Sequence, residues 1–194
     1  KVYFIGVNNL DSIETSVSKL RRLLDESRIL DFIKKGDKAA IKMHFGEEGN
    51  TGYVKPRYLR VICDSISARA AVPVLADTNT LYRGKRMKSD GHLKLAREHG
   101  FTKAAVGADI LAIDDKEKEN ITSVKIDARF IKAAKVCKFF LDADAIVDVS
   151  HFKGHIMTGF GGALKNIGMG CATREGKLAQ HSDIAPFVII NNCV

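Results

Sequence analysis

Residues 148–181 read DVSHFKGHIMTGFGGALKNIGMGCATREGKLAQH, and this stretch holds three of the six histidines of the chain. A β-branched run at residues 145–149 leads into it as a buried strand would. The glycines at 159, 161 and 162 then precede residues 163–167, which can begin a helix. A strand, a glycine turn and a helix start together aim backbone N–H groups at an anion, so we expect Gly161 and Gly162 to bind one.

Three side chains in this stretch have the chemistry of a binding or catalytic site. His155, Lys165 and His181 follow one another at separations of ten and sixteen residues, with the glycines between the first two. A turn at the glycines would fold them toward one pocket. A purely structural interpretation stays open, in which the glycines only let a strand pack closely on a helix and the histidines lie at the surface or in the core.

Strand-like and helix-like patterns alternate along the rest of the chain. The expected strands are residues 2–7, 38–45, 72–77, 109–113, 121–126 and 145–149, with a solvated turn at 114–119. The expected helices are one capped by Asp11 and those at residues 55–70, 90–99 and 130–141. This alternation predicts an α/β fold with three layers, in which helices cover both faces of a mainly parallel sheet.

Polar residues follow several of these strands, where parallel sheets bind their ligands. His44 ends the strand 38–45, Asp77 and Asn79 follow the next one, and His151 follows the strand 145–149. The glycine-rich loop 46–52 and the basic loop 78–86 are therefore candidate walls of a site. His92 and His99 lie seven residues apart on one expected helix, and we expect them to face solvent.

Composition narrows the class of protein. The 194 residues are 45% hydrophobic, which suits one soluble α/β ligand-binding domain over residues 1–194. A net charge of +8 favours small anionic ligands, whereas the dispersed basic residues give no pattern for nucleic acid. The sequence shows no membrane span and no signal peptide. Four cysteines without a C-x-x-C pair indicate a reducing cytoplasm, with Cys63 and Cys137 in the core.

Several common catalytic motifs are absent, which disfavours nucleotide kinases, Rossmann dehydrogenases, zincins and α/β-hydrolases. His151 and His155 have metal-ligand spacing only if they lie on a helix, and Gly154 favours a loop there. The candidate metal ligands are His155, His181, His151, His44 and Cys193. The residues expected to contact a cofactor or ligand are Gly161, Gly162, Lys165, Asn166, Asp77 and Asn79, and the candidate catalytic residues are His155 and Lys165.

Residues 155–170, HIMTGFGGALKNIGMG, with Lys153 before them, resemble the central motif of the domain of unknown function 362 family, often labelled Fe–S center proteins. Longer members carry a ferredoxin-type module with cysteines in C-x-x-C-x-x-C-x-x-x-C-P order, after an apolar strand like residues 187–190. The resemblance implies that Cys193 is the first of these cysteines and that the chain is truncated before or at the module. It also implies a 4Fe–4S cluster in the full-length protein and an electron-transfer partner.

The same stretch is more distantly similar to the nickel-pincer lactate racemase family. That resemblance implies that His155 transfers protons, that Lys165 attaches the pincer cofactor and that His181 binds nickel. The loop Thr78-Asn79-Thr80 lacks the second catalytic histidine of that family, so two-base racemization does not follow.

Three functions are therefore open. The first is a ligand-binding domain beside an Fe–S cluster in electron-transfer or reductase chemistry, with Arg174 near Lys165. The second is a pincer-cofactor-dependent racemase or epimerase of a hydroxy acid. The third is a metal or anion binder without catalysis, so the sequence leaves open whether the chain is an enzyme, and it does not give the oligomeric state.

Overall fold

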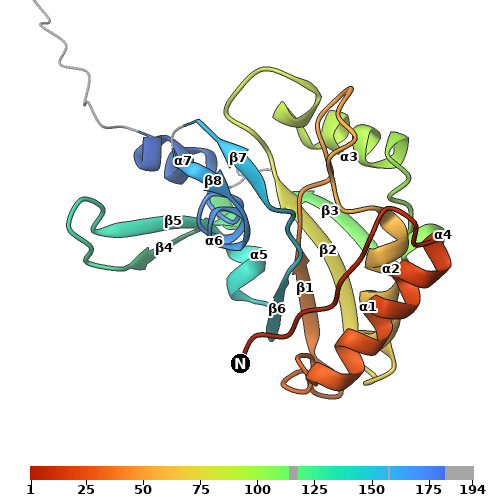
Figure 1. Ribbon diagram of the computed structural model, residues 1–194. Coiled ribbons are helices and arrows are strands. Elements are labelled where there is room, and N and C mark those ends of the chain that lie inside the picture. The colour runs from red at the N-terminus through yellow and green to blue at the C-terminus, as the bar shows by residue number, and fades with distance from the viewer. Residues whose placement is uncertain (114–117, 157, 182–194) are drawn as a thin grey trace, which may run out of the picture.

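A parallel sheet forms the centre of the molecule in the computed structural model, which describes residues 1–113, 118–156 and 158–181 (Figure 1). The strand order is β3-β2-β1-β6. These strands are β1 (Lys38–Lys42), β2 (Val72–Thr78), β3 (Asp109–Ile113) and β6 (Ala145–Asp148). All neighbours in this order pair in parallel, so the carboxyl ends of the four strands lie at one edge.

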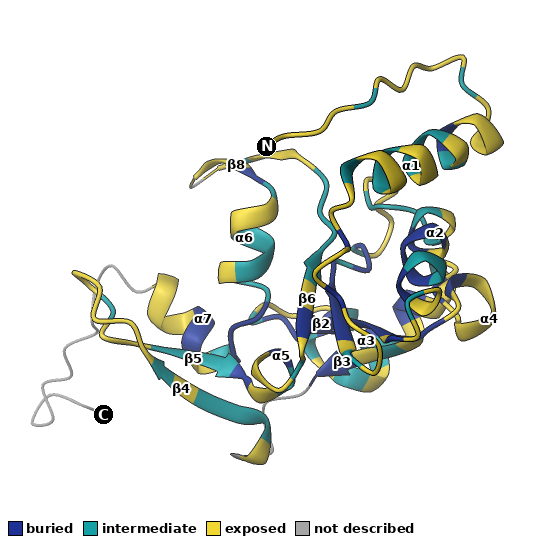
Figure 2. Cartoon of the chain, turned by 90° about the horizontal axis from the view of Figure 1, so that it is seen from below, coloured by how far each residue is buried: buried dark blue, intermediate teal, exposed yellow. Residues whose placement is uncertain are grey.

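Helices cover both faces of this sheet, as the sequence predicts. The helices are α1 (Ile13–Ser27), α2 (Pro56–Ser67), α3 (Ser89–Glu98), α4 (Lys103–Val106), α5 (Lys138–Leu141), α6 (Ala163–Gly168) and α7 (Arg174–His181), with single 3-10 turns at Lys85–Met87 and Lys118–Asn120. Helices α1, α2 and α4 lie on one side of the sheet, and α5 and α6 lie on the other (Figure 2). None of the helices within the described ranges is long and apolar enough to cross a membrane.

The central strands are apolar because both of their faces are buried. Side chains alternate between the faces of a strand. In β1, Ala39 and Ile41 therefore join the larger core, which includes Leu59 of α2. Ala40 points the other way and packs in a second core with Phe140 of α5. Each large apolar side chain buried in this way stabilises the fold by about 1.5–3 kcal/mol.

The expected capping residue of α1 is wrong by one position. The side chain of Ser12, not Asp11, accepts the hydrogen bond from the backbone N–H of Thr15. Asp11 instead accepts from the backbone N–H of Asn8 and forms an ion pair with Lys19 at 2.6 Å. Aspartate and serine are both common N-cap residues. Because Asp11 is already bound to Asn8 and Lys19, Ser12 caps the helix.

Residues 130–141 are not the expected single helix. They form β5 (Ala133–Cys137) followed by the single-turn helix α5. β5 pairs antiparallel with β4 (Ile121–Lys125) in a separate ribbon that stands beside the main sheet in Figure 1. The apolar residues Ala134 and Val136 fit the period of a strand as well as a helix, so the pairing with β4 decides the outcome. Most of the expected turn at residues 114–119 lies outside the described residues, and β3 and β4 on either side of it belong to different sheets.

Residues 2–7 are also not the expected strand. The side chains of Val2 and Phe4 are 96% and 90% exposed. High β-propensity alone does not make a strand, because a strand needs a neighbour that bonds its backbone. Within the described part of the chain, these residues are assigned no strand neighbour.

The glycine stretch takes a different form from the expected turn. β7 (Lys153–His155) pairs antiparallel with β8 (Gly159–Gly161), so most of the glycines lie in a small hairpin. Gly162 is the N-cap of α6, which is only six residues long. The helix start is therefore confirmed, and the strand that enters it is β8 instead of β6.

Candidate functional site

A cleft of about 550 Å³ opens at the carboxyl edge of the sheet. Its walls come from the ends of β1 and β2, the β7–β8 hairpin, α6 and α7. The cleft is lined by most of the residues that the sequence singles out, namely His44, Asp77, His151, His155, Gly161, Gly162, Lys165, Asn166 and His181. Asn79 is buried and does not line it, and Cys193 lies outside the described residues. The structure thus brings these residues together, while their roles stay predictions.

Asp77, at the end of β2, is the buried anion at the inner end of the cleft. Its side chain is almost fully buried and forms ion pairs with Lys42 at 3.0 Å and with Arg86 at 2.8 Å. Burial alone would raise the pKa of Asp77, but the charges of Lys42 and Arg86 outweigh burial and hold the pKa well below its usual range. Asp77 is therefore ionised at neutral pH and serves to hold two cations in place.

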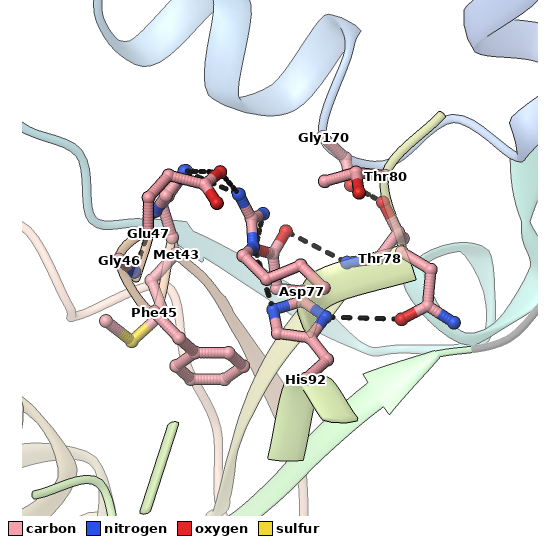
Figure 3. Close-up of polar contacts among 12 residues, drawn as sticks. Met43, Phe45, Gly46, Glu47, Asp77, Thr78, Thr80, His92 and Gly170 are labelled. Atoms are coloured by element: carbon pink, nitrogen blue, oxygen red, sulfur yellow. Dashed lines mark hydrogen bonds and ion pairs between the residues drawn. The ribbon is translucent and has the colours of Figure 1, made fainter. Parts of the chain in front are cut away.

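The expectation that His92 faces solvent is wrong, because its side chain is 0% exposed and lies beside Asp77 (Figure 3). Arg86 Nε donates to His92 Nε2 at 3.2 Å, so the ring proton is on Nδ1, which lies 3.2 Å from Asn79 Oδ1. Burial lowers the pKa of His92 to about 4, although Asp77 opposes this shift. His92 is thus neutral and orients Arg86. His92 lies three residues before the apolar Leu95 and therefore on the same face of α3. This spacing could have identified His92 as buried.

Lys42 is a site residue that sequence reasoning missed. Its Nζ donates to Asn166 Oδ1 at 2.6 Å and to the carbonyl oxygen of Met43 at 2.9 Å. The amide nitrogen of Asn166 donates in turn to the carboxylate of Asp148. These bonds fix α6 to the ends of β1 and β6. The signal in the sequence is a lysine within the otherwise apolar residues 39–43, since buried lysines require partners.

Lys177 on α7 was missed as well. Its side chain is 7% exposed, and its Nζ donates to Thr78 Oγ1 and to the carbonyl oxygen of Asn79, both at 2.5 Å. Burial lowers the pKa of Lys177 to about 8. Lys177 and His181 are four residues apart and so share one face of α7, which is the signal that could have found it.

His155, Lys165 and His181 reach the cleft from three different elements, β7, α6 and α7. The backbone N–H of Thr158 donates to His155 Nδ1 at 3.3 Å, which places the ring proton of neutral His155 on Nε2. Partial desolvation and the positive charges of Lys165 and Lys153 lower the pKa of His155. His181 Nδ1 lies 2.8 Å from the carbonyl oxygen of Lys177, so Nδ1 donates and Nε2 keeps its lone pair.

The expected neighbour of Lys165, Arg174, has a different contact. Its guanidinium donates to the carbonyl oxygen of Met87 at 3.1 Å. The expected metal ligands His44 and His151 both line the cleft, and His151 precedes a strand instead of lying on a helix. Among the described residues, no three His, Cys, Asp or Glu side chains are grouped closely enough to hold a metal ion. The metal roles therefore stay predictions.

The two expected wall loops are joined through Glu47. The carboxylate of Glu47 accepts hydrogen bonds from the Tyr82 hydroxyl and from Arg86 Nη1. Burial would raise the pKa of Glu47, but His44 at 3.6 Å, the hydrogen bond from Tyr82 and the charge of Arg86 lower it to about 2. Arg86, in the second loop, is thereby held between Glu47 of the first loop and Asp77 of β2, and it is a further residue that the sequence did not single out.

Gly170 permits the close approach of α6 to β1 and β2. Its carbonyl oxygen accepts from the Thr78 hydroxyl at 2.8 Å. A β-carbon at this position would lie 2.5 Å from Lys42 Nζ and closer still to the backbone oxygen of Asn166. We expect Gly170→Ala to destabilise the protein by about 1–3 kcal/mol, because Lys42 and α6 must shift to make room.

Urea unfolding followed by circular dichroism measures this effect, and Gly168→Ala is the matched control. A β-carbon at Gly168 meets no atom within 4 Å. The control should leave the midpoint unchanged or raise it slightly, since alanine favours a helix over glycine. Equal unfolding curves for the two variants would show that α6 does not pack against Lys42 as described.

Comparison with known proteins places the fold among characterised ones. The family described as Domain of unknown function (DUF362) matches residues 39–189, whereas no curated protein sequence matches the chain. Among solved structures, the lactate racemase apoprotein from Thermoanaerobacterium thermosaccharolyticum has a similar fold, with a TM-score of 0.62 and 17% sequence identity. The similarity covers 85% of this chain but only 39% of the racemase chain. At this identity the comparison shows a shared fold alone.

Proposed function

Because the chain belongs to the family described as Domain of unknown function (DUF362), which names no activity, we propose a function from the chemistry of the cleft. We propose that the cleft binds a small anionic ligand, and that His155, Lys165 and His181 act on this ligand or on a cofactor bound beside it. The volume of about 550 Å³ suits a small molecule.

The charge of the cleft carries this proposal. Five cationic side chains line it against one carboxylate, Asp77, which leaves a net charge of +4 when the histidines are neutral. The cations are Lys42, Lys153, Lys165, Lys177 and Arg86. Like charges held in one partly dry cleft attract and retain a ligand of opposite sign. Carboxylates and phosphates are the small anions that ammonium groups commonly bind.

The residues of the outer cleft have complementary chemistry. Partial desolvation and the cationic neighbours lower the pKa of His155 and so favour its neutral form, which presents Nε2–H to a ligand as a hydrogen-bond donor or a proton source. Lys165 supplies an amine that can bind an anion or form a covalent bond. His181 offers the lone pair of Nε2, which can accept a proton or bind a metal.

A nickel-pincer cofactor, as in a racemase or epimerase of a hydroxy acid, is the second candidate. The shared fold over 85% of the chain favours it, together with the placement of the three residues in one cleft. His181 fits such a group, because a metal-binding histidine donates its other N–H to a carbonyl or carboxylate oxygen, as His181 does. Lys165 would attach the cofactor and His181 would bind the nickel that it supplies.

The iron–sulfur interpretation is a further proposal. It places the cleft beside a 4Fe–4S cluster that includes Cys193, with an electron-transfer partner. The buried thiols of Cys63 and Cys171 agree with a cytoplasmic setting. Iron and sulfide analysis of the full-length gene product tests it, and a product without iron that also lacks further cysteines after Cys193 would contradict it.

Thermal unfolding with lactate and with lactamide tests the main proposal. The two compounds differ chiefly in charge, and a ligand that binds the folded state raises the melting temperature. We expect lactate to raise it in a saturable manner at constant ionic strength, and lactamide to have little effect. Inorganic phosphate should act like lactate if the cleft binds both anions. Equal shifts with lactate and lactamide, and no shift with phosphate, would contradict an anion site.

A further inference from the structure

The five cations of the cleft are not equally available to a ligand. Lys153 and Lys165 lie on the exposed hairpin and on α6, at the outer end of the cleft. Lys42, Arg86 and Lys177 are buried, and they lie at the inner end with Asp77. A buried cation normally requires an anionic partner, so the pairing of these three decides which of them can bind a ligand.

Lys42 and Arg86 already have partners. The three N–H groups of Lys42 are directed at Asp77, Asn166 and the carbonyl oxygen of Met43. The guanidinium of Arg86 pairs with Asp77 on one side and Glu47 on the other, and its Nε donates to a neutral histidine. Both cations are therefore committed to the protein itself.

Lys177 differs from these two, because its recorded acceptors are neutral. An ammonium group has three N–H donors. Lys177 directs two of them at Thr78 Oγ1 and the carbonyl oxygen of Asn79. The hydroxyl proton of Thr78 is directed at the carbonyl oxygen of Gly170, so Thr78 can only accept from Lys177. Among the described residues, no carboxylate lies within ion-pair distance of the Lys177 ammonium.

The charge balance at the inner end agrees with this difference. Among the described residues, two carboxylates lie within ion-pair distance of the three buried cations: Asp77 and Glu47 both contact Arg86, and Asp77 also contacts Lys42. The excess positive charge is thus that of Lys177. Lys177 is 7% exposed and lines the cleft, so a ligand in the cleft can supply an acceptor for its third N–H.

We infer that Lys177 binds the anionic group of the ligand, a carboxylate or a phosphate, at the inner end of the cleft. This inference rests on the proposed function and locates the anion within it. The ligand then extends outward, so that its remaining part lies near His155 and Lys165. Burial lowers the pKa of Lys177, although the charge of Asp77 opposes this shift, and this direction agrees with a buried ammonium that has no ion-pair partner among the described residues.

This location differs from the anion site expected at Gly161 and Gly162. Gly161 lies in β8, where a β-carbon would meet the side chains of Lys153 and Lys165 at 3.5–3.7 Å. Helix α6, which follows, is only six residues long. A buried ammonium binds an anion more tightly than the start of so short a helix does. The ammonium carries a full positive charge that is largely shielded from water, whereas a helix start carries a partial charge.

Binding of malonate and of inorganic phosphate to Lys177→Gln tests the inference. Glutamine keeps N–H donors for Thr78 and Asn79 but removes the charge. We expect the dissociation constant of at least one anion to rise at least about tenfold, the loss typical of a hydrogen bond to a charged group. Lys94→Gln, which removes an exposed charge on α3, should change it less than about twofold.

The outcomes separate this inference from the proposed function. Unchanged affinity in Lys177→Gln with a lowered melting temperature would mean that Lys177 is only structural. That result would contradict the inference about Lys177. If Lys165→Ala still weakened anion binding, the proposed function would remain supported. If the wild-type protein binds neither anion, both fall.

Chemical labelling of the wild-type protein covers the case in which Lys177→Gln fails to fold. Acetic anhydride modifies neutral amines, and peptide mass mapping reports each lysine separately. We expect saturating malonate or phosphate to slow the labelling of Lys177 at least about tenfold relative to Lys94, since a bound anion blocks the amine and favours its charged form. Equal labelling of Lys177 with and without either anion would overturn the inference.

Discussion

Asp77→Asn is expected to destabilise the protein by about 3–5 kcal/mol, the cost of breaking a buried ion pair by removing one partner. The substitution keeps the size of the side chain but leaves Lys42 and Arg86 without the carboxylate that they share at 3.0 and 2.8 Å. Urea unfolding measures the change. Asp109→Asn is the control, because its ion pair with Lys103 is exposed at the surface and should contribute less than about 1 kcal/mol.

The same ion pairs give the stability a defined dependence on pH. The folded-state pKa of Asp77 lies below its ordinary value of 3.8, so the stability that it contributes is complete above that value and is lost as the pH falls. Glu47, with its pKa lowered to about 2, acts in the same direction. The wild-type protein should therefore lose stability steeply below about pH 4, and Asp77→Asn should show a shallower decline. Parallel declines would show that Asp77 is not held in its ionised form.

Lys165→Ala, His155→Ala and His181→Ala are each expected to weaken ligand binding at least about tenfold, because each removes a polar contact to the ligand or cofactor. If the three residues hold one group, a double substitution should cost little more than a single one, since residues that act together are not additive. Calorimetric titration with the anions that bind the wild-type protein measures the affinities.

Stability is the second readout for these variants. None of the three side chains belongs to the buried cores, so each substitution should change the free energy of unfolding by less than about 0.5 kcal/mol. Lys132→Ala is the charge-matched control for Lys165→Ala, since the Lys132 side chain is 70% exposed and remote from the residues that line the cleft. Unchanged affinity in all three variants, or a large loss of stability in each, would assign these residues a structural role.

Features that depend on local sequence patterns could be predicted from the sequence alone. The runs of small and β-branched residues at 38–42 and 72–78 predict buried strands because both faces of a parallel strand are covered. The carboxyl ends of parallel strands share one edge, so His44 and Asp77 are expected at the same edge without knowledge of the tertiary structure. His155 and Lys165 can be predicted as site residues because they flank the glycine stretch, where two parts of the backbone can approach each other closely.

The remaining features depend on contacts between distant parts of the chain. β5 exists because it pairs with β4, and its own pattern fits a helix as well. Residues 2–7 have the composition of a strand, yet composition supplies no backbone partner. The sequence marks Lys42 and Lys177 only by their positions in a strand and on a helix face, and the fold then buries them at Asp77 and Thr78. Their chemistry could not be predicted, because it depends on burial and not on residue type.

Anomalous diffraction from crystals soaked in selenate tests the central claim, that this cleft is an anion site, most directly. Selenate is a heavy analogue of the small oxyanions that the cleft is proposed to bind, and its position can be located without prior assumptions. We expect a strong peak within hydrogen-bond distance of Lys177 Nζ or, further out, between Lys165 and His155. Peaks confined to the outer surface of the molecule, with no selenate in an accessible cleft, would contradict it.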